Sequence, residues 1–266
     1  MSRLAFTAIA VALAVPARAG IVLEFQDADQ KQTTVELEGK KLRSSPENRQ
    51  DGHWAIFDGE NHVLYAFDEK DKSYRRIDEA TASEMGKRLK DVAERAKAKM
   101  TPEQRAQLEA FLAAQEGSKK PKEHTWNFER TGGSEKVAGF SCDDYRVLRD
   151  GSPNGEACFI RWGSGAFRKE DFQAVQEMGR FLEKTFAEMS EAEGRGKPRA
   201  WRTEWITHFV DTGPGFPAVM DRVEKDGKRT RGMQLVKIER KSIDAGRFAP
   251  PADYREKPFS MTGGPD

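Results

Sequence analysis

Short runs of alternating apolar and polar residues fill the chain from residue 20 to residue 78. The clearest runs are residues 34–38, 54–57, 62–67 and 73–77. Between neighbouring runs lie Gly39-Lys40 and Asp58-Gly59, which are typical of turns. Because alternation with a period of two places every second side chain on one face of a sheet, these runs predict a meander of short antiparallel strands.

Helical periodicity replaces this alternation after residue 78. Apolar residues recur at spacings of three and four, at Met85, Leu89, Val92, Ala96 and Met100. This spacing lines one face of a helix, which we expect over about residues 79–100. A second helix should continue to about residue 116, because Thr101, Pro102 and Gln104 match the capping-box start of a helix.

Strands are expected again beyond the polar linker at residues 117–121. Residues 124–130, 140–149 and 156–162 read as strands, and the turn formers from Asp150 to Gly155 predict a hairpin of the last two. A third helix should cover about residues 169–192. Its apolar side comprises Phe172, Val175, Met178, Leu182, Phe186 and Met189. Residues 219–224 and 233–240 then predict a final strand pair across Asp226-Gly227.

The order of these elements is strands, helices, hairpin, helix and strands. Repeated alternation of strand and helix, which would indicate a parallel sheet, is missing from this pattern. We therefore expect an α+β fold. It should form a single domain over residues 20–266, with helical insertions at about residues 79–116 and 169–192.

Residues 1–19 have the composition of a cleavable signal peptide. Arg3 provides a basic start, Leu4 to Val15 form an apolar run, and Ala17 and Ala19 are small residues where a signal peptidase reads. An apolar run of this length rises only about 18 Å as a helix, against roughly 30 Å of hydrocarbon in a bilayer. We therefore expect cleavage before Gly20 and a periplasmic or otherwise exported, soluble product.

The remaining chain is highly charged but nearly neutral. Charged residues make up 33% of the sequence, and no later stretch approaches the apolar length of a transmembrane segment. The 45 basic residues, less Arg3 and Arg18, nearly balance the 44 acidic ones. This balance gives no electrostatic footprint for nucleic acid, so neither nucleic-acid binding nor a membrane span is expected.

The two cysteines, Cys142 and Cys158, fall on opposite arms of the predicted hairpin. A modest adjustment of strand register would bring them within disulfide range, and an oxidising compartment favours the bond. A redox or metal site is the alternative, but the sequence has no Cys-x-x-Cys spacing and no adjacent histidine cluster. We expect a structural disulfide.

The sequence offers no recognisable catalytic or cofactor motif. Its histidines, His53, His62, His124 and His208, have no metal-ligand spacing. The glycine-containing segments at 163–165 and 213–215 match neither a phosphate-binding loop nor a nucleophile elbow. We therefore expect no enzyme activity, no catalytic residue, no metal and no cofactor.

Alternation over residues 201–209 predicts one more strand, with large aromatic side chains on one face. These are Trp201, Trp205 and Phe209. On a curved sheet they could line a ligand cavity, whereas rings on a strand face more often fill an interior. We retain both interpretations and treat the three residues as candidate cavity lining.

Three segments resemble a bacterial family of exported proteins, domain of unknown function 4412. They are Trp54 to Gly59 with residues 64–68 and 72–74, Val137 to Tyr145 with residues 155–162, and Ile243 to Tyr254. The last resembles the Phe-x-x-Pro-x-Gly-Tyr ending of that family, with Asp253 where glycine is usual. Cys158 stands where an aromatic residue is expected. The family is itself similar to the lipoprotein carriers of the periplasm.

This resemblance implies a strongly curved antiparallel sheet, a half-open barrel, with helices packed on its concave side. Carriers with such a fold hold acyl chains on that side, but the resemblance transfers no functional residue. We therefore expect a periplasmic binding or carrier module for an apolar ligand such as a lipid or acyl chain. A non-catalytic interaction or structural protein of the envelope with a filled interior is the alternative. A hydrolase without a visible motif ranks last. A protein partner is not predictable from the sequence.

Overall fold

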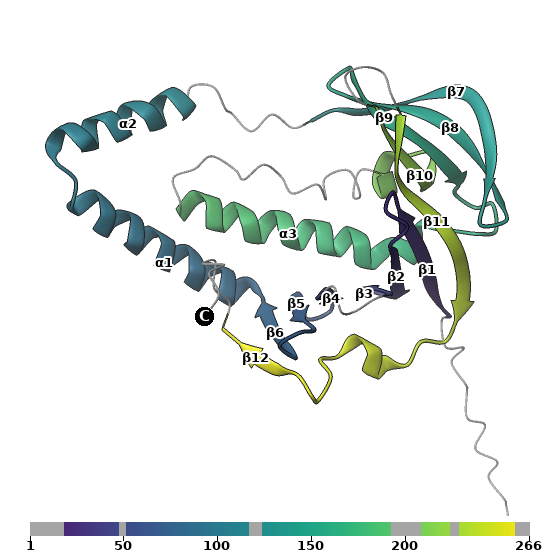
Figure 1. The fold of residues 1–266 in the computed structure, drawn as a ribbon, viewed down its shortest axis with the longest axis horizontal. Helices are drawn as coiled ribbons and strands as arrows, with labels where there is room; N and C mark the ends of the chain where they lie inside the picture. The colour runs from purple at the N-terminus through teal and green to yellow at the C-terminus, as the bar shows by residue number, and fades with distance from the viewer. Residues whose placement is uncertain (1–18, 48–51, 117–123, 193–208, 224–228, 259–266) are drawn as a thin grey trace, which may run out of the picture.

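The structure is a computed structural model that describes residues 19–47, 52–116, 124–192, 209–223 and 229–258 (Figure 1). The predicted signal peptide, except Ala19, lies outside these residues. Six strands come first: β1 (Gly20–Asp27), β2 (Gln32–Glu38), β3 (Lys41–Pro46), β4 (His53–Asp58), β5 (Val63–Asp68) and β6 (Ser73–Ile77). Two helices and three strands follow: α1 (Glu79–Ala98), α2 (Pro102–Glu116), β7 (Trp126–Val137), β8 (Phe140–Arg149) and β9 (Ser152–Arg161).

The C-terminal part contains the third long helix and the remaining strands. It comprises the short helix η2 (Lys169–Phe172), α3 (Gln173–Ala192), β10 (Gly215–Val223), β11 (Arg229–Lys241), the short helix η3 (Ala245–Phe248) and β12 (Arg255–Lys257). The predicted α+β composition is confirmed, with one large sheet and few helices.

All strands of the described residues belong to one open 12-stranded sheet, in the order β12-β6-β5-β4-β3-β2-β1-β11-β10-β9-β8-β7. Neighbours are antiparallel except β12, which lies parallel to β6. β1 lies in the middle: Ile21 pairs with Leu37 of β2 on one side and with Arg240 of β11 on the other. The first described strand therefore joins the N-terminal meander to the C-terminal strands.

The apolar side chains of the sheet are divided between its two faces by strand alternation. Ile21 and Leu23 of β1 and Phe57 of β4 are buried in the largest core cluster, together with Phe172 and Phe181 from η2 and α3. We call this side of the sheet the α3 face. Val22, between Ile21 and Leu23, is instead buried in a separate cluster on the opposite face. A one-residue slip of β1 would exchange these two sets.

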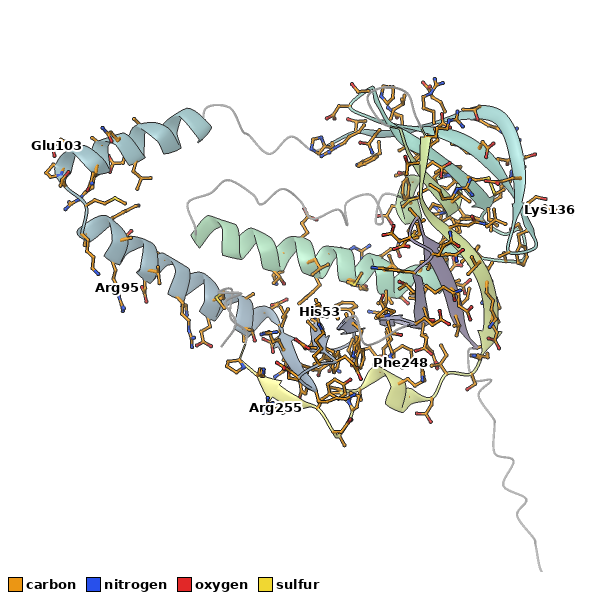
Figure 2. The ribbon with its side chains drawn as sticks, viewed as in Figure 1. His53, Arg95, Glu103, Lys136, Phe248 and Arg255 are labelled. Atoms are coloured by element: carbon orange, nitrogen blue, oxygen red, sulfur yellow. A yellow bond between two sulfur atoms is a disulfide. The ribbon has the colours of Figure 1, made fainter. Side chains whose placement is uncertain are left out.

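Residues 242–257, which we call the C-terminal strap, cover that opposite face. Ile243, Phe248 and Tyr254 of the strap are buried in one cluster with strand residues. The strand members are Val22, Trp54, Ile56 and Phe67. The Trp54 ring stacks on Phe67 at 3.7 Å between centroids and meets Tyr254 edge-on at 5.7 Å. Figure 2 shows Phe248 and Arg255 along this strap. Both faces of the N-terminal half are therefore covered.

The predicted start of α2 is confirmed in detail. The Thr101 hydroxyl accepts the backbone N–H of Gln104 at 3.3 Å, and the Gln104 side chain accepts the backbone N–H of Thr101 at 3.0 Å. This is the expected capping box, with α2 beginning at Pro102.

The predicted hairpin is confirmed with a shorter turn, because the turn was expected over Asp150 to Gly155 and β9 already begins at Ser152. Asp150 and Gly151 connect β8 to β9 with φ angles of 53° and 77°, as a tight hairpin turn requires.

The helices differ in how they contact the rest of the chain. α1 packs against α3, with Ala82 and Met85 of its first half buried. Beyond this contact α1 extends away from the sheet and leads into α2 (Figure 1). Val92, predicted on the apolar side of α1, is 63% exposed. None of the helices in the described part of the chain combines the length and apolarity needed to cross a membrane.

Candidate functional site

Of the three aromatic residues predicted to share a strand face, the structure describes Phe209. Trp201 and Trp205 lie outside the described residues. Phe209 lies in a short helical turn whose described part is residues 209–212, so the predicted strand is wrong at this residue. The backbone N–H of Gly213 donates to the Phe209 carbonyl at 3.1 Å, and a Cβ at Gly213 would lie 2.4 Å from that oxygen. This close return favours the turn over an extended strand.

Phe209 lies in a cluster of rings on β7, β8 and β9, which we call the aromatic cluster. Its members are Trp126, Phe128, Tyr145, Phe159 and Phe209. The Phe209 ring lies 5.4 Å from both Phe128 and Phe159, and 6.4 Å from Trp126. These tilted and edge-on contacts are the arrangements that aromatic rings prefer.

The burial of the aromatic cluster indicates whether Phe209 packs in the core or lines a cavity. Phe159 and Phe209 are 0% and 3% exposed, whereas Trp126, Phe128 and Tyr145 are half-buried. Phe209 therefore packs in the core, which favours the second of the two interpretations given for it. Three partly exposed rings remain around it on the surface of the sheet.

The α3 face is the second candidate for an apolar site, and α3 occupies it. The Phe181 ring lies 5.5 Å from Phe57 of β4, and Phe172 stacks on Phe216 of β10 at 4.9 Å. Phe172, Val175 and Phe181 are all buried. The apolar side of the helix thus takes the place that an apolar ligand would need.

Polar contacts at the rim tie this helical segment to its neighbours. Glu177 lies 3.8 Å from Lys40, and the Lys184 ammonium lies 2.9 Å from Glu79 of α1. The Gln176 amide donates to the Asp211 carboxylate at 2.5 Å. Most of these groups are exposed, so each contact contributes little to stability.

The start of the segment is anchored more firmly by Asp171. Its carboxylate accepts hydrogen bonds from Arg240 of β11 at 2.5 and 3.2 Å and from the Arg168 backbone N–H at 2.8 Å. Partial burial acts to raise the pKa of Asp171, but the Arg240 hydrogen bond and then the Arg168 one outweigh it and lower the pKa. Asp171 is therefore held as a carboxylate that fixes η2 to the sheet.

One polar group on α3 lacks a partner among the described residues. Thr185 is 1% exposed, and its hydroxyl oxygen has no hydrogen bond there. It follows Phe181 by one helical turn and so shares its side of the helix. A buried hydroxyl without a hydrogen bond costs about 1–3 kcal/mol, so Thr185 reduces the free energy that α3 gains by burial.

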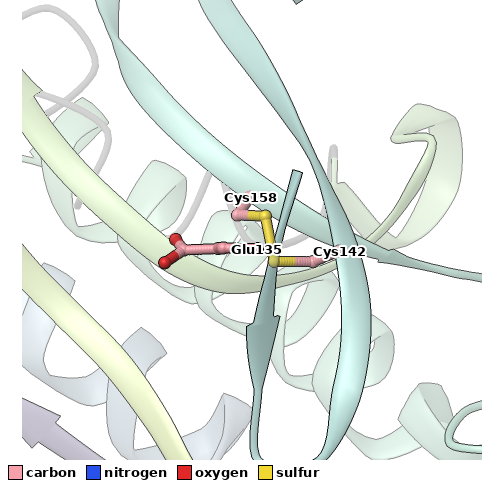
Figure 3. Close-up of side chains that lie close together, drawn as sticks. All are labelled: Glu135, Cys142 and Cys158. Atoms are coloured by element: carbon pink, nitrogen blue, oxygen red, sulfur yellow. A yellow bond between two sulfur atoms is a disulfide. The ribbon is translucent and has the colours of Figure 1, made fainter. Parts of the chain in front are cut away.

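The disulfide predicted between Cys142 and Cys158 is present, with a Cα–Cα distance of 5.4 Å. Cys158 pairs with Asp144 in the ladder, so the bond runs diagonally between β8 and β9. Glu135 of β7 pairs with Cys142, and the three potential ligand atoms lie within 4.8 Å of one another (Figure 3). The two sulfurs are bonded to each other, so only the Glu135 carboxylate is available as a ligand. The group does not fit a metal.

A histidine–carboxylate pair was not predicted. His124 Nδ1 lies 2.7 Å from the Asp150 carboxylate, which also accepts the backbone N–H of Thr125 at 3.1 Å. Asp150 belongs to the β8–β9 turn and His124 precedes β7, so the contact fastens the entry of β7 to that turn. The residues are 26 positions apart, and no local spacing signals their contact.

Sequence reasoning also missed a buried charged cluster under the C-terminal strap. Glu36 of β2 and Arg43 of β3 are 4% and 5% exposed. The Glu36 carboxylate accepts a hydrogen bond from Arg43 at 3.3 Å. Both its oxygens also accept hydrogen bonds from Arg247 of the strap, at 2.7 and 2.8 Å. Arg43 also stacks over the Trp54 ring at 4.9 Å. An arginine in an alternating strand pattern predicts an exposed side chain. The burial of Arg43 becomes visible only when the strap is placed over it.

These features define an α+β protein built on one open, mostly antiparallel sheet, with apolar clusters on both faces. The family model described as Domain of unknown function (DUF4412) matches residues 99–254. This is more than half of the chain, and the chain belongs to that family. The predicted resemblance to this family is thus confirmed for the second and third segments, whereas the first segment, at residues 54–74, lies outside the matched residues. The similarity of the family to lipoprotein carriers stays a prediction.

Comparison with other proteins adds little. A crystal structure of an uncharacterized conserved protein from Thermus thermophilus is similar over 90% of this chain and 90% of that chain. Its sequence identity is 6% and its TM-score is 0.42, so it supports no argument about function. No curated protein matches the chain.

Proposed function

We propose that this protein is a periplasmic, non-catalytic binding or carrier module for an apolar ligand such as a lipid or acyl chain. The ligand would occupy the α3 face in place of α3. The observation that carries the proposal is the match between that face and the helix, which bury Phe57 and Phe181 against each other. A surface that accepts one apolar segment can accept another apolar body when the helix moves.

The position and packing of α3 support this proposal. Val175 and Phe181 of α3 are buried on the α3 face, which we propose to be the concave side of a bent sheet. Its rim contacts are mostly exposed ion pairs, and Thr185 adds a buried hydroxyl without a partner among the described residues. The likeness of the family to periplasmic lipoprotein carriers, expected from the sequence, points to the same use.

The proposed compartment rests on the predicted signal peptide at residues 1–19 and on the disulfide. The bond between Cys142 and Cys158 closes a loop within one hairpin, and such bonds persist in oxidising compartments. The paired sulfurs leave no thiol among the described cysteines for redox or nucleophilic chemistry.

Native mass spectrometry with lipid extraction, on protein purified from its own envelope, tests the proposal directly. A stoichiometric lipid that leaves on denaturation is the expected result. Apo protein that also fails to bind an added fluorescent fatty acid would contradict it.

Removal of one buried side chain of α3 gives a sharper test. Phe181→Ala weakens the packing of α3 on the sheet and so raises the population in which the face is open. We expect it to lower the melting temperature and to tighten binding of the fluorescent fatty acid by about tenfold or more. Phe209→Ala is the matched control, because it also removes one phenyl ring, but from the aromatic cluster. It should lower the melting temperature and leave fatty-acid binding unchanged.

The second candidate is an interaction or structural protein of the envelope with a permanently filled interior. The packing of Phe172, Val175 and Phe181 into the α3 face favours it, because these side chains already fill that surface. In this case Phe181→Ala and Phe209→Ala should destabilise the protein alike, and neither should bind the fatty acid.

A further inference from the structure

Residues 87–99, the C-terminal part of α1 with its cap residue Lys99, combine exposure with a strong positive charge. We call this segment the basic arm. Ala82 and Met85, just before it, are buried, whereas its described side chains are exposed. Val92, 63% exposed, is the exposed large apolar side chain of the described chain. The segment carries six basic residues and two acidic ones. Neither feature serves the packing of α1 on α3.

The residues of the basic arm are ordered around the helix axis. At 3.6 residues per turn, Val92 and Ala96 continue the apolar stripe that starts at Met85. Basic residues follow both borders of this stripe: Lys90 and Lys97 on one side, Arg88, Arg95 and Lys99 on the other. The far side of the helix holds both acidic residues and one lysine: Asp91, Glu94 and Lys87. An apolar stripe with basic borders and a charged back is the pattern of a helix lying in a membrane interface.

The ion pairs of the basic arm stay within its own helix. Arg88 lies 2.5 Å from Glu84 and Lys97 lies 3.9 Å from Glu94, and all four side chains are largely exposed. These pairs are of the weak helical kind, and they leave the excess positive charge of the segment in place. The charge is therefore available to a negatively charged surface.

We propose that the basic arm docks this protein on an anionic lipid surface. Val92 and the apolar stripe would enter the boundary between headgroups and acyl chains. The basic residues on both borders would reach the lipid phosphates with their long side chains. An anionic bilayer matches both the apolar stripe and its two basic borders. The proposal does not depend on an apolar ligand in the α3 face.

The basic arm lies far from the outer strands of the sheet (Figure 2). Figure 2 shows Arg95 and Glu103 at one end of the molecule and Lys136 at the opposite end. The arm thus projects away from the large sheet, which would stay clear of the lipid. The contact is peripheral and reversible, because a single interfacial helix binds far more weakly than a membrane-spanning one.

Flotation of the full-length mature protein with vesicles tests the proposal. One set of vesicles is phosphatidylcholine, and the other contains about 30% phosphatidylglycerol, which supplies the anionic surface. We expect binding to the anionic vesicles, little binding to the neutral ones, and loss of binding as salt is raised from about 0.05 M to 0.5 M.

Charge reversal identifies the surface responsible. Lys90→Glu with Lys97→Glu should weaken binding to anionic vesicles on the order of thirtyfold or more. Val92→Glu should also abolish most binding by placing a charge in the apolar stripe. The matched control is Lys70→Glu with Lys136→Glu, two exposed lysines elsewhere with the same change in net charge. It should bind almost like the natural protein.

Three results would overturn the proposal. They are a failure of the natural protein to bind anionic vesicles, equal binding to neutral vesicles, and equal losses in the arm and control variants. Because the altered side chains are exposed, the variants should melt at the natural temperature. Fatty-acid binding by the α3 face is measured without vesicles, so failure of either proposal leaves the other standing.

Discussion

Glu36 shows how one carboxylate can hold two arginines from distant parts of the chain. Arg43 is its neighbour on the adjacent strand, and Arg247 belongs to the C-terminal strap. A buried charge is destabilising unless it is paired, so the cluster stabilises the fold only when all three charged groups are present. The same carboxylate aligns the strap over Trp54, because Arg43 stacks on that ring.

Removal of this charge tests that interpretation. Glu36→Gln leaves the buried Arg43 without its counter-charge, and we expect a loss of about 3 kcal/mol in the free energy of unfolding. Urea unfolding measures it. Glu60→Gln is the control, because Glu60 pairs with Lys41 at an exposed site and should cost less than about 1 kcal/mol. Similar small losses in both variants would contradict the interpretation that Glu36 is an essential counter-charge for the buried Arg43.

Asp143 gives a pH-dependent contribution at the same scale. The hydrogen bond from Arg161, followed by that from Arg130, lowers its pKa from the ordinary 3.8, and both distances are 2.6 Å. A carboxyl whose pKa is lower in the folded state stabilises fully above its unfolded pKa. That stability is lost as the pH falls through the folded pKa.

We therefore predict that Asp143→Asn destabilises the protein by a constant amount at neutral pH. The difference from the natural protein should begin to shrink below about pH 4, where Asp143 is protonated in the unfolded state. It should vanish only below the lowered pKa of the folded state, where both states are protonated. Thermal melts between about pH 2 and 7 measure it. A difference that persists in acid would place its cause in packing.

Among the elements, the β8–β9 hairpin is fixed by one tight turn and one covalent bond. The turn at Asp150 and Gly151 sets its register, and the bond between Cys142 and Cys158 joins its arms. The cysteines are 16 positions apart in sequence. By the chain-entropy model a loop of this size is worth about 3 kcal/mol, through restriction of the unfolded chain.

Replacement of both cysteines by serine should therefore lower the free energy of unfolding by about 3 kcal/mol while the sheet is retained. Urea unfolding followed by far-ultraviolet circular dichroism measures both quantities. The natural protein with its disulfide reduced should behave like the variant. Loss of the sheet signal in the variant would show that the bond is needed for the fold itself.

Local rules account for the elements that were predicted well. The capping box at Thr101 and Gln104 and the Asp150-Gly151 turn depend on neighbouring residues, which the sequence displays directly. Phe209 was misplaced because its alternating neighbours suggest a strand, whereas its conformation is set by rings on β7 and β9. The strap was recognised only as a family ending, since its packing partners lie in the first third of the chain.

For the whole molecule, the candidate sites were less predictable than the sheet. The exposure of Val92 depends on where α3 stops covering α1, and the burial of Glu36 depends on the strap. Both are long-range effects. The sequence predicted strand and helix types from periodicity, but it contains no comparable signal for which face another element will cover.

The central place of β1 affects the order in which the chain can fold. Gly20 pairs with Lys241, so the first strand gains its second neighbour only when almost the entire polypeptide is available. Until then its apolar residues Ile21 and Leu23 border an open edge that invites pairing with other chains. A sheet whose central strands pair only through such a distant contact forms slowly. The newly made chain therefore depends on being kept apart from its own copies until its last strands arrive.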